Sequence, residues 1–154
     1  MEMGFNAGHS AELFLTNDVD CVTSFDLDEH EYLHFGKKYI DARYRYKHDL
    51  FIGGSKNAVP RFPSKKPDAT FDFIFIDGGH DYETATADLK NCRSMARDQS
   101  IVVLDDVIYD PSFQRSYNVG PTRAWRDSIR SGHVQELGYE MYSMGRGMSW
   151  GRYL

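Results

Sequence analysis

FDFIFIDGGHDYETATADLKNCRSMARDQSIVVLDD, residues 71–106, contains the pattern that decides the fold. Two short runs, Phe71–Ile76 and Ile101–Leu104, are rich in aromatic and β-branched residues, and each ends at an aspartate. Between them, Tyr82–Ala96 repeats small and apolar residues at spacings of 4, 3 and 4, which is typical of one helix face. Nearly continuous apolar runs indicate strands that are buried on both faces of a parallel sheet. The stretch therefore predicts a strand–helix–strand unit.

The segments before and after this unit continue the alternation. Further strands are predicted at Cys21–Phe25 and Leu50–Ile52. Helices are predicted to begin at Ser10, near Glu29 and after Gly120–Pro121, where proline suits the first helical turn. This order predicts a doubly wound α/β fold with a mostly parallel sheet.

The rest of the chain reads as loops and a terminal hairpin. Arg61–Thr70, with two prolines and two lysines, is predicted to be a surface loop, and Tyr109–Val119 a second long loop. After Gly132 an aromatic-rich alternation predicts an antiparallel hairpin, with GRGMSWG, residues 145–151, as its turn and final strand. Residues 1–154 are expected to form a single domain. Only Met1–Met3 precede the first glycine turn, so we expect the N-terminus to be shortened.

Composition excludes several classes of protein. The 154 residues carry 18 Lys+Arg and 23 Asp+Glu, a net charge of −5, with no block of basic residues that could follow nucleic acid. No apolar run approaches the roughly 20 residues that span a bilayer. The two cysteines lie far apart, so we expect no disulfide and a cytoplasmic location. Oligomer formation is not indicated.

The first candidate site is the loop EMGFNAGHS, residues 2–10. Gly4 and Gly8 frame a tight strand-to-helix turn, where absent side chains let a ligand approach the backbone, and Ser10 is placed to cap the helix. The glycine pair alone fits a structural turn equally well. Asn6 stands where a dinucleotide fingerprint requires its second glycine, which disfavours a nicotinamide dehydrogenase.

Asp26 is the second candidate. It ends the second predicted strand, about 20 residues after the glycine loop. In Rossmann-like folds an acidic residue at this position accepts hydrogen bonds from both ribose hydroxyls of a nucleoside. A solvated strand end is the alternative, but the spacing from the loop favours the binding role.

Acidic residues also follow two predicted neighbouring strands. Asp77 ends one strand, and Asp105 and Asp106 end the next, so three carboxylates should converge at the carboxyl edge of the sheet. Two such charges about 4 Å apart repel by about 4 kcal/mol at an effective dielectric near 20. The cluster therefore requires a shared proton or a hard cation such as Mg²⁺ or Ca²⁺. In the alternative interpretation, one aspartate caps a helix or faces solvent.

His80 lies three residues after Asp77, in the turn before the helix. A histidine beside a metal site, with a pKa near neutrality, can take a proton from a substrate hydroxyl. The alternative is a hydrogen-bonded surface histidine. A metallophosphohydrolase shares the D-x-x-H and acidic pair, but an early D-x-H and the extra histidines of a two-metal site are missing.

Taken together, the chain resembles the class I S-adenosylmethionine-dependent methyltransferases, particularly the small-molecule O-methyltransferases with a D-x-x-H strand end and a paired acidic metal site. EMGFNAGHS matches the family's glycine loop, SFD its ribose-binding acid, and GGS, residues 53–55, its adenine segment, with Gly54 where an acid is common. The resemblance implies these cofactor-binding residues: Glu2, Gly4, Asn6, Gly8, Ser10, Asp26, Ser55 and Asp77.

The resemblance also implies a reaction. Asp77, Asp105 and Asp106 would hold Mg²⁺, and His80 would act as the base in O-methylation of a small hydroxylated molecule. The helices that commonly precede this domain in the family have no counterpart before Met1. The alternative function is therefore a catalytically inactive domain that binds an adenosyl cofactor.

Overall fold

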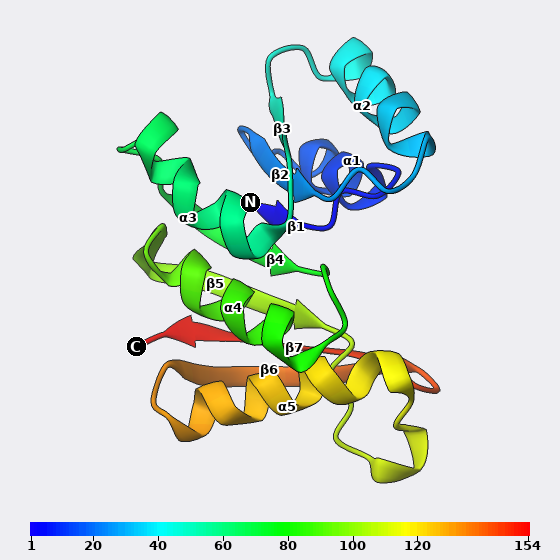
Figure 1. The fold of residues 1–154 in the computed structure, drawn as a ribbon, viewed down its shortest axis with the longest axis vertical. Coiled ribbons are helices and arrows are strands. Elements are labelled where there is room, and N and C mark those ends of the chain that lie inside the picture. The colour runs from blue at the N-terminus through cyan, green and yellow to red at the C-terminus, as the bar shows by residue number, and fades with distance from the viewer.

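The computed structural model describes residues 1–154 and contains one seven-stranded sheet with the order β3-β2-β1-β4-β5-β7-β6 (Figure 1). The strands are β1 (Glu2–Met3), β2 (Val22–Asp26), β3 (His48–Ile52), β4 (Phe71–Ile76), β5 (Ala96–Asp105), β6 (Val134–Ser143) and β7 (Arg146–Tyr153). Strands β1 to β5 pair in parallel, whereas β7 is antiparallel to both β5 and β6. The predicted mostly parallel sheet with a C-terminal antiparallel hairpin is confirmed.

Helices cover the sheet on both faces. They are α1 (His9–Thr16), α2 (Tyr32–Arg43), α3 (Ser55–Lys65), α4 (Tyr82–Arg93) and α5 (Ser116–Arg130), with a short 3-10 turn at Pro111–Phe113. Helices α3, α4 and α5 pack in a row over one face, where Phe62, Leu89 and Trp125 belong to the main core (Figure 1). A smaller core, including Leu15 and Leu33, lies beneath α1 and α2. Burial of apolar side chains on two sides of the sheet stabilises this layered arrangement.

The sheet order reverses at its centre. Strand β1 consists of only two residues, yet it pairs with β2 on one side and β4 on the other. Connections from β1 and β4 leave in opposite directions, so the carboxyl ends of these strands open a crevice between them, the usual ligand position in such folds.

The prediction of a loop at Arg61–Thr70 is wrong in its first half. Helix α3 continues to Lys65 and contains Pro60 and Pro63, each of which removes a backbone donor. Val59 and Phe62 are fully buried, and the Phe62 ring packs edge-on against Phe25 and Phe51. This packing outweighs the low helix propensity of proline.

The prediction of a long loop at Tyr109–Val119 also needs correction, because α5 begins at Ser116 rather than after Gly120. Asn118 is fully buried, and its Oδ1 accepts a hydrogen bond from the backbone N–H of Arg115 at 2.8 Å. This side-chain cap lets the helix start one turn before Pro121.

The chain contains neither a disulfide bond nor a membrane-spanning helix. The cysteines are unpaired, with Cys21 exposed and Cys92 on the buried face of α4. No helix is both long enough and apolar enough to cross a membrane.

Candidate functional site

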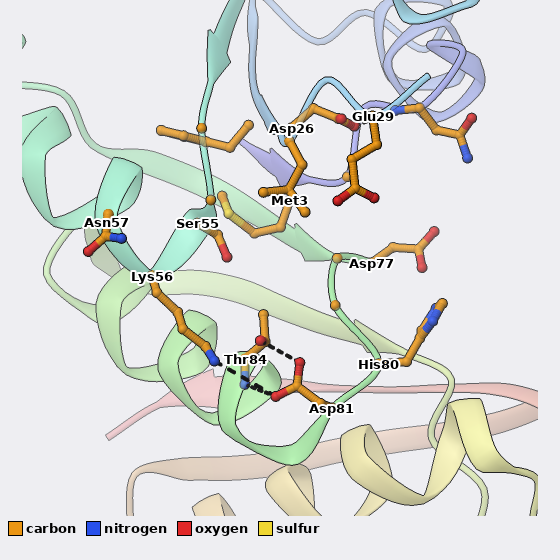
Figure 2. A pocket seen from close by; sticks show the side chains of 18 of the residues that line it. Met3, Asp26, Glu29, Ser55, Lys56, Asn57, Asp77, His80, Asp81 and Thr84 are labelled. Atoms are coloured by element: carbon orange, nitrogen blue, oxygen red, sulfur yellow. Dashed lines mark hydrogen bonds and ion pairs between the residues drawn. The ribbon is translucent and has the colours of Figure 1, made fainter. Parts of the chain in front are cut away.

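A cavity of about 590 Å³ opens at the carboxyl ends of β1, β2 and β4. Its volume lies in the usual range for sites that bind small molecules or cofactors. Figure 2 shows Asp26 and Glu29 on one side of this cavity and Lys56 and Asp81 on the other. Of the residues predicted to bind a cofactor, those lining the cavity are Gly4, Asn6, Asp26, Ser55 and Asp77.

The β1–α1 turn brings the glycine loop against the end of β4. Gly4 has a φ of +88°, and a Cβ at this position would lie 2.0 Å from the carbonyl oxygen of Asp77. Only glycine combines this backbone conformation with such a close approach. The turn and Asp77 therefore form one continuous floor of the cavity.

Asp26 lies beside this turn, as the spacing predicted. Its Oδ2 accepts hydrogen bonds from the backbone N–H groups of Phe5 and Asn6 at 2.9 and 2.8 Å, and its Oδ1 accepts one from Asp28 at 3.0 Å. A carboxylate offers about four acceptor positions, so these bonds leave room for one ligand hydroxyl on Oδ1. Asp26 thus both fixes the loop and faces the cavity.

Glu2 and Ser10 lie behind the cavity rather than in its lining. Glu2 is fully buried, and its two carboxylate oxygens each accept a hydrogen bond of 2.6 Å, one from Ser10 and one from Ser24. Ser10 therefore does not cap α1, whose N-cap is Gly8 in the left-handed conformation. Gly8 is likewise absent from the lining. It packs against Phe5 instead, since a Cβ there would lie 2.8 Å from the Phe5 ring. These residues shape the loop from beneath.

The buried network extends from Glu2 to the third strand. His48 Nε2 lies 2.7 Å from Ser24 Oγ, and the His48 ring stacks on Phe5 with centroids 4.9 Å apart. Burial raises the pKa of Glu2 to about 7, which the two serine hydrogen bonds partly oppose. Burial also lowers the pKa of His48 to about 4. Near neutral pH the histidine is uncharged and the glutamate is half protonated.

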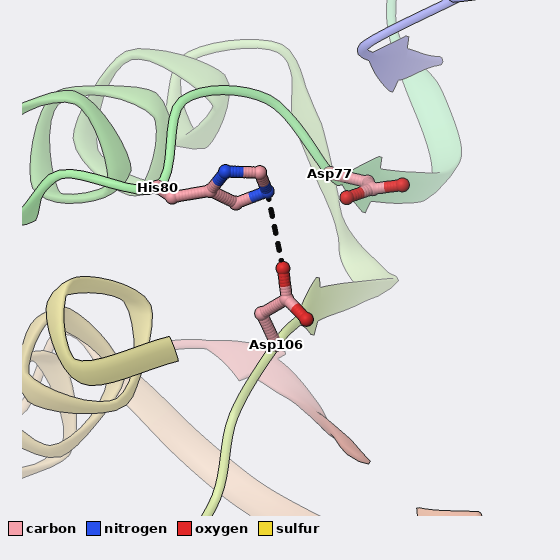
Figure 3. Close-up of side chains that lie close together, drawn as sticks. All are labelled: Asp77, His80 and Asp106. Atoms are coloured by element: carbon pink, nitrogen blue, oxygen red, sulfur yellow. Dashed lines mark ion pairs between the residues drawn. The ribbon is translucent and has the colours of Figure 1, made fainter. Parts of the chain in front are cut away.

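Asp77, His80 and Asp106 form the acidic cluster of the site. One ligand atom from each lies within 4.8 Å of the others, and His80 Nε2 is 3.1 Å from Asp106 Oδ2 (Figure 3). Asp106 is almost completely buried and adopts a φ of +57°, an uncommon conformation outside glycine. Two carboxylates and an imidazole are ligands that divalent cations bind.

Asp105, the third predicted metal ligand, is close enough to repel Asp77 and Asp106 but is not among the three residues whose ligand atoms come together. Its Oδ1 accepts a hydrogen bond from the Tyr142 hydroxyl at 3.1 Å. Strand β5 ends at Asp105, and the left-handed backbone of Asp106 directs its carboxylate to His80. The group that can hold a cation is therefore Asp77, His80 and Asp106.

The electrostatics of the cluster fit a cationic ligand. Although solvent reaches Asp77, its carboxylate lies in a concavity, where desolvation and then repulsion from Asp105 and Asp106 raise its pKa to about 6. Desolvation and then Asp105 also raise the pKa of Asp106, while His80 and Arg146 oppose this change. A bound cation would relieve the repulsion and lower the pKa of both carboxyls.

Helix α5 approaches His80 closely at Gly120. A Cβ on Gly120 would lie 2.3 Å from the carbonyl oxygen of His80. The absent side chain lets α5 pack against the His80 turn, and the Tyr117 ring lies edge-on to the imidazole with centroids 6.2 Å apart. The helix therefore limits the space available to His80.

Sequence reasoning missed several residues of the site. Glu29 and Lys56 line the cavity, but charged residues after strand ends are too common to single them out. Arg146 belongs to GRGMSWG, interpreted above only as hairpin turn and strand, yet its Nη1 contacts Asp106 Oδ1 at 3.1 Å. The strand pairing of β5 with β7 creates this contact, and no local motif signals it.

The geometry defines a doubly wound α/β domain with an acidic, glycine-lined ligand cavity at its switch point, and comparison with known families agrees. A family model described as a methyltransferase domain matches residues 1–107. The chain belongs to this methyltransferase domain family. No curated protein matches the chain.

Solved structures share the fold. CalS11, a TDP-rhamnose 3'-O-methyltransferase of calicheamicin biosynthesis, has 20% identity and a TM-score of 0.71, with 99% of this chain and 69% of that chain covered. An O-methyltransferase from Bacillus cereus in complex with SAH has 16% identity and a TM-score of 0.77, covering 98% and 72%. An SAH-bound methyltransferase from Podospora anserina has 15% identity and a TM-score of 0.71, covering 99% and 70%.

Proposed function

We propose that the chain is an S-adenosylmethionine-dependent O-methyltransferase that acts on a small hydroxylated molecule with help from a divalent cation. The observation that carries this proposal is the continuity between the glycine-lined cavity and the Asp77–His80–Asp106 cluster, because His80 and Asp77 line both. A cofactor and a hydroxyl acceptor would therefore meet at the cluster.

The cavity fits the cofactor by chemistry and by shape. Asp26 Oδ1 can accept a ribose hydroxyl, Ser55 lies where the adenine segment was predicted, and the Asp77 carboxylate favours a sulfonium cation. Bound S-adenosylmethionine supplies the electrophilic methyl group, which forms a bond to the acceptor oxygen as its bond to sulfur breaks. Gly4 and Asp26 would align that group, and alignment of this kind can lower a barrier by roughly 7 to 11 kcal/mol.

His80 is placed to act as the general base. When its Nε2 donates a hydrogen bond to Asp106, its Nδ1 is the acceptor that can take the proton of the substrate hydroxyl. Asp106 would hold the ring in this tautomer and stabilise the imidazolium that forms. A base in this position typically contributes about 10²- to 10⁴-fold in rate.

Asp77 and Asp106 fit a divalent cation, because their oxygens approach one another in a pocket that raises both carboxyl pKa values. A bound Mg²⁺ would lower the pKa of a coordinated acceptor hydroxyl. The role of the two aspartates is to hold the cation beside the cavity, and the role of His80 is to receive the proton.

The test is methyl transfer from labelled S-adenosylmethionine to a panel of phenols, catechols and sugar nucleotides, with Mg²⁺ or with a chelator. We expect Mg²⁺-dependent turnover that Asp106→Asn lowers by at least about 100-fold, because it removes a cation ligand and the group that orients the His80 base. Asp105→Asn is the matched control and should retain most of the activity, because Asp105 bonds to Tyr142 outside the cluster.

Calorimetry with S-adenosylhomocysteine separates the alternatives. Both variants should bind it about as tightly as the unmodified chain, because neither residue lines the cavity. Tight binding with no transfer to any acceptor would instead identify an inactive cofactor-binding domain. Full turnover in chelator would refute the metal role alone.

A further inference from the structure

The tip of the β6–β7 hairpin lies against Asp105 and Asp106, the acid pair at the end of β5. One residue from each strand of the hairpin contacts one acid: the Tyr142 hydroxyl donates to Asp105, and Arg146 Nη1 donates to Asp106 Oδ1, both at 3.1 Å. The acid pair is thus covered by donors from a segment about forty residues later in the chain.

Arg146 is held in place by more than its ion pair. Its guanidinium lies over the Tyr117 ring, 4.6 Å from the centroid, and the Tyr117 hydroxyl donates to the carbonyl oxygen of Gly145 at 3.0 Å. Asn118 Nδ2 donates to the same carbonyl at 3.1 Å. Helix α5 therefore fixes the hairpin tip so that the guanidinium faces Asp106.

Each oxygen of Asp106 lies 3.1 Å from a side-chain nitrogen in this arrangement. Oδ2 faces His80, and Oδ1 accepts the Arg146 hydrogen bond. The Asp106 side chain is only 2% exposed, whereas half of the Arg146 side chain is exposed. Asp106 is therefore enclosed by protein, whereas Arg146 borders solvent.

From this geometry we propose that Arg146 is a tethered cation that competes with a divalent metal ion for Asp106. This inference rests on the proposed metal role of the Asp77–His80–Asp106 cluster. A guanidinium bound to Asp106 Oδ1 repels a divalent cation held by the same carboxylate, because both carry positive charge within a few ångströms. When the metal site is empty, Arg146 neutralises the buried carboxylate, and metal binding releases it.

The experiment measures binding of Mn²⁺ alone, by the paramagnetic resonance signal of the free ion, to the full chain and three variants. Arg146→Met removes the competitor, and Arg146→Lys keeps the charge but loses the planar donor. Arg115→Met is the control. It removes one nearby positive charge whose Nη1 bonds only to the carbonyls of Ser112 and Gln114.

We expect Arg146→Met to tighten Mn²⁺ binding by about 10-fold, because the repulsion between the guanidinium and the ion is removed. The Mn²⁺ affinity of Arg146→Lys should lie between those of Arg146→Met and the unmodified chain. Arg115→Met should change the affinity less than about 2-fold. In the unmodified chain, Mn²⁺ should also speed amide exchange at residues 144–147, because the hairpin tip loses its contact with Asp106.

Unchanged or weaker Mn²⁺ binding by Arg146→Met would overturn the inference, because Arg146 would then support the site. The inference would also be overturned if neither the unmodified chain nor Arg146→Met bound Mn²⁺. Calorimetry with S-adenosylhomocysteine on the same samples shows whether such a failure extends to cofactor binding, and therefore to the proposed function.

Discussion

Replacement of the buried carboxyl at the first strand, Glu2→Gln, should stabilise the chain in a pH-dependent manner. The carboxyl is inaccessible to solvent and bonded to Ser10 and Ser24, and an amide of the same shape can bond to both serines. The substitution removes the cost of a buried charge while it preserves the packing.

The size of the effect follows from the pKa. The folded chain holds the pKa of Glu2 at about 7, against an ordinary value of 4.5, so the folded state binds the proton more tightly. Stability is therefore lost as pH rises from 4.5 through 7. At about 1.4 kcal/mol per pKa unit, Glu2→Gln should be more stable by about 1 kcal/mol at pH 5 and about 3 kcal/mol at pH 8.

Urea denaturation of both chains at pH 5, 6, 7 and 8 measures this difference. His48 acts in the opposite direction, because its lowered pKa makes stability rise with pH from about 4 to 6.5, and the subtraction cancels its contribution. Glu83→Gln is the control: its side chain is 86% exposed, so the difference should stay near zero. A Glu2→Gln difference that is flat across this range would refute the assigned burial cost.

Two glycine substitutions test the packing around the site. Gly4→Ala should lower the free energy of unfolding by at least about 3 kcal/mol and weaken S-adenosylhomocysteine binding. The reason is that it adds a Cβ 2.0 Å from a backbone oxygen at a φ of +88°. Equal affinity by calorimetry would contradict the role of the turn. Gly120→Ala should cost about 1 to 3 kcal/mol and reduce methyl transfer, because α5 must move away from the His80 carbonyl. An unchanged Tm for Gly120→Ala would show that the helix is not held there.

Local sequence was sufficient to predict most of the fold. Strand β4 and helix α4 follow directly from apolar spacing, with α4 ending three residues earlier than expected. Helix α3 could not be predicted, because the burial of Phe62 against distant aromatic rings overrides its two prolines. Such packing depends on tertiary contacts that propensity does not contain.

The candidate site was predicted only where neighbouring strands place it. Asp77 and His80 share one strand end, and parallel pairing of β4 with β5 brings Asp106 beside them. The division of roles between Asp105 and Asp106 was not predictable, because it depends on the left-handed backbone of Asp106 after the end of β5. Arg146 was not predictable, since its position depends on the register between β5 and β7.

The insertion of β7 between β5 and β6 has a consequence for synthesis on the ribosome. Strand β6 emerges first but has no hydrogen-bonding partner in the sheet until β7 follows it. Residues through β5 can assemble the cofactor cavity while β5 still presents an open edge, a surface prone to pairing with other chains. The nascent chain should therefore acquire this cavity before the β6–β7 hairpin reaches Asp105 and Asp106.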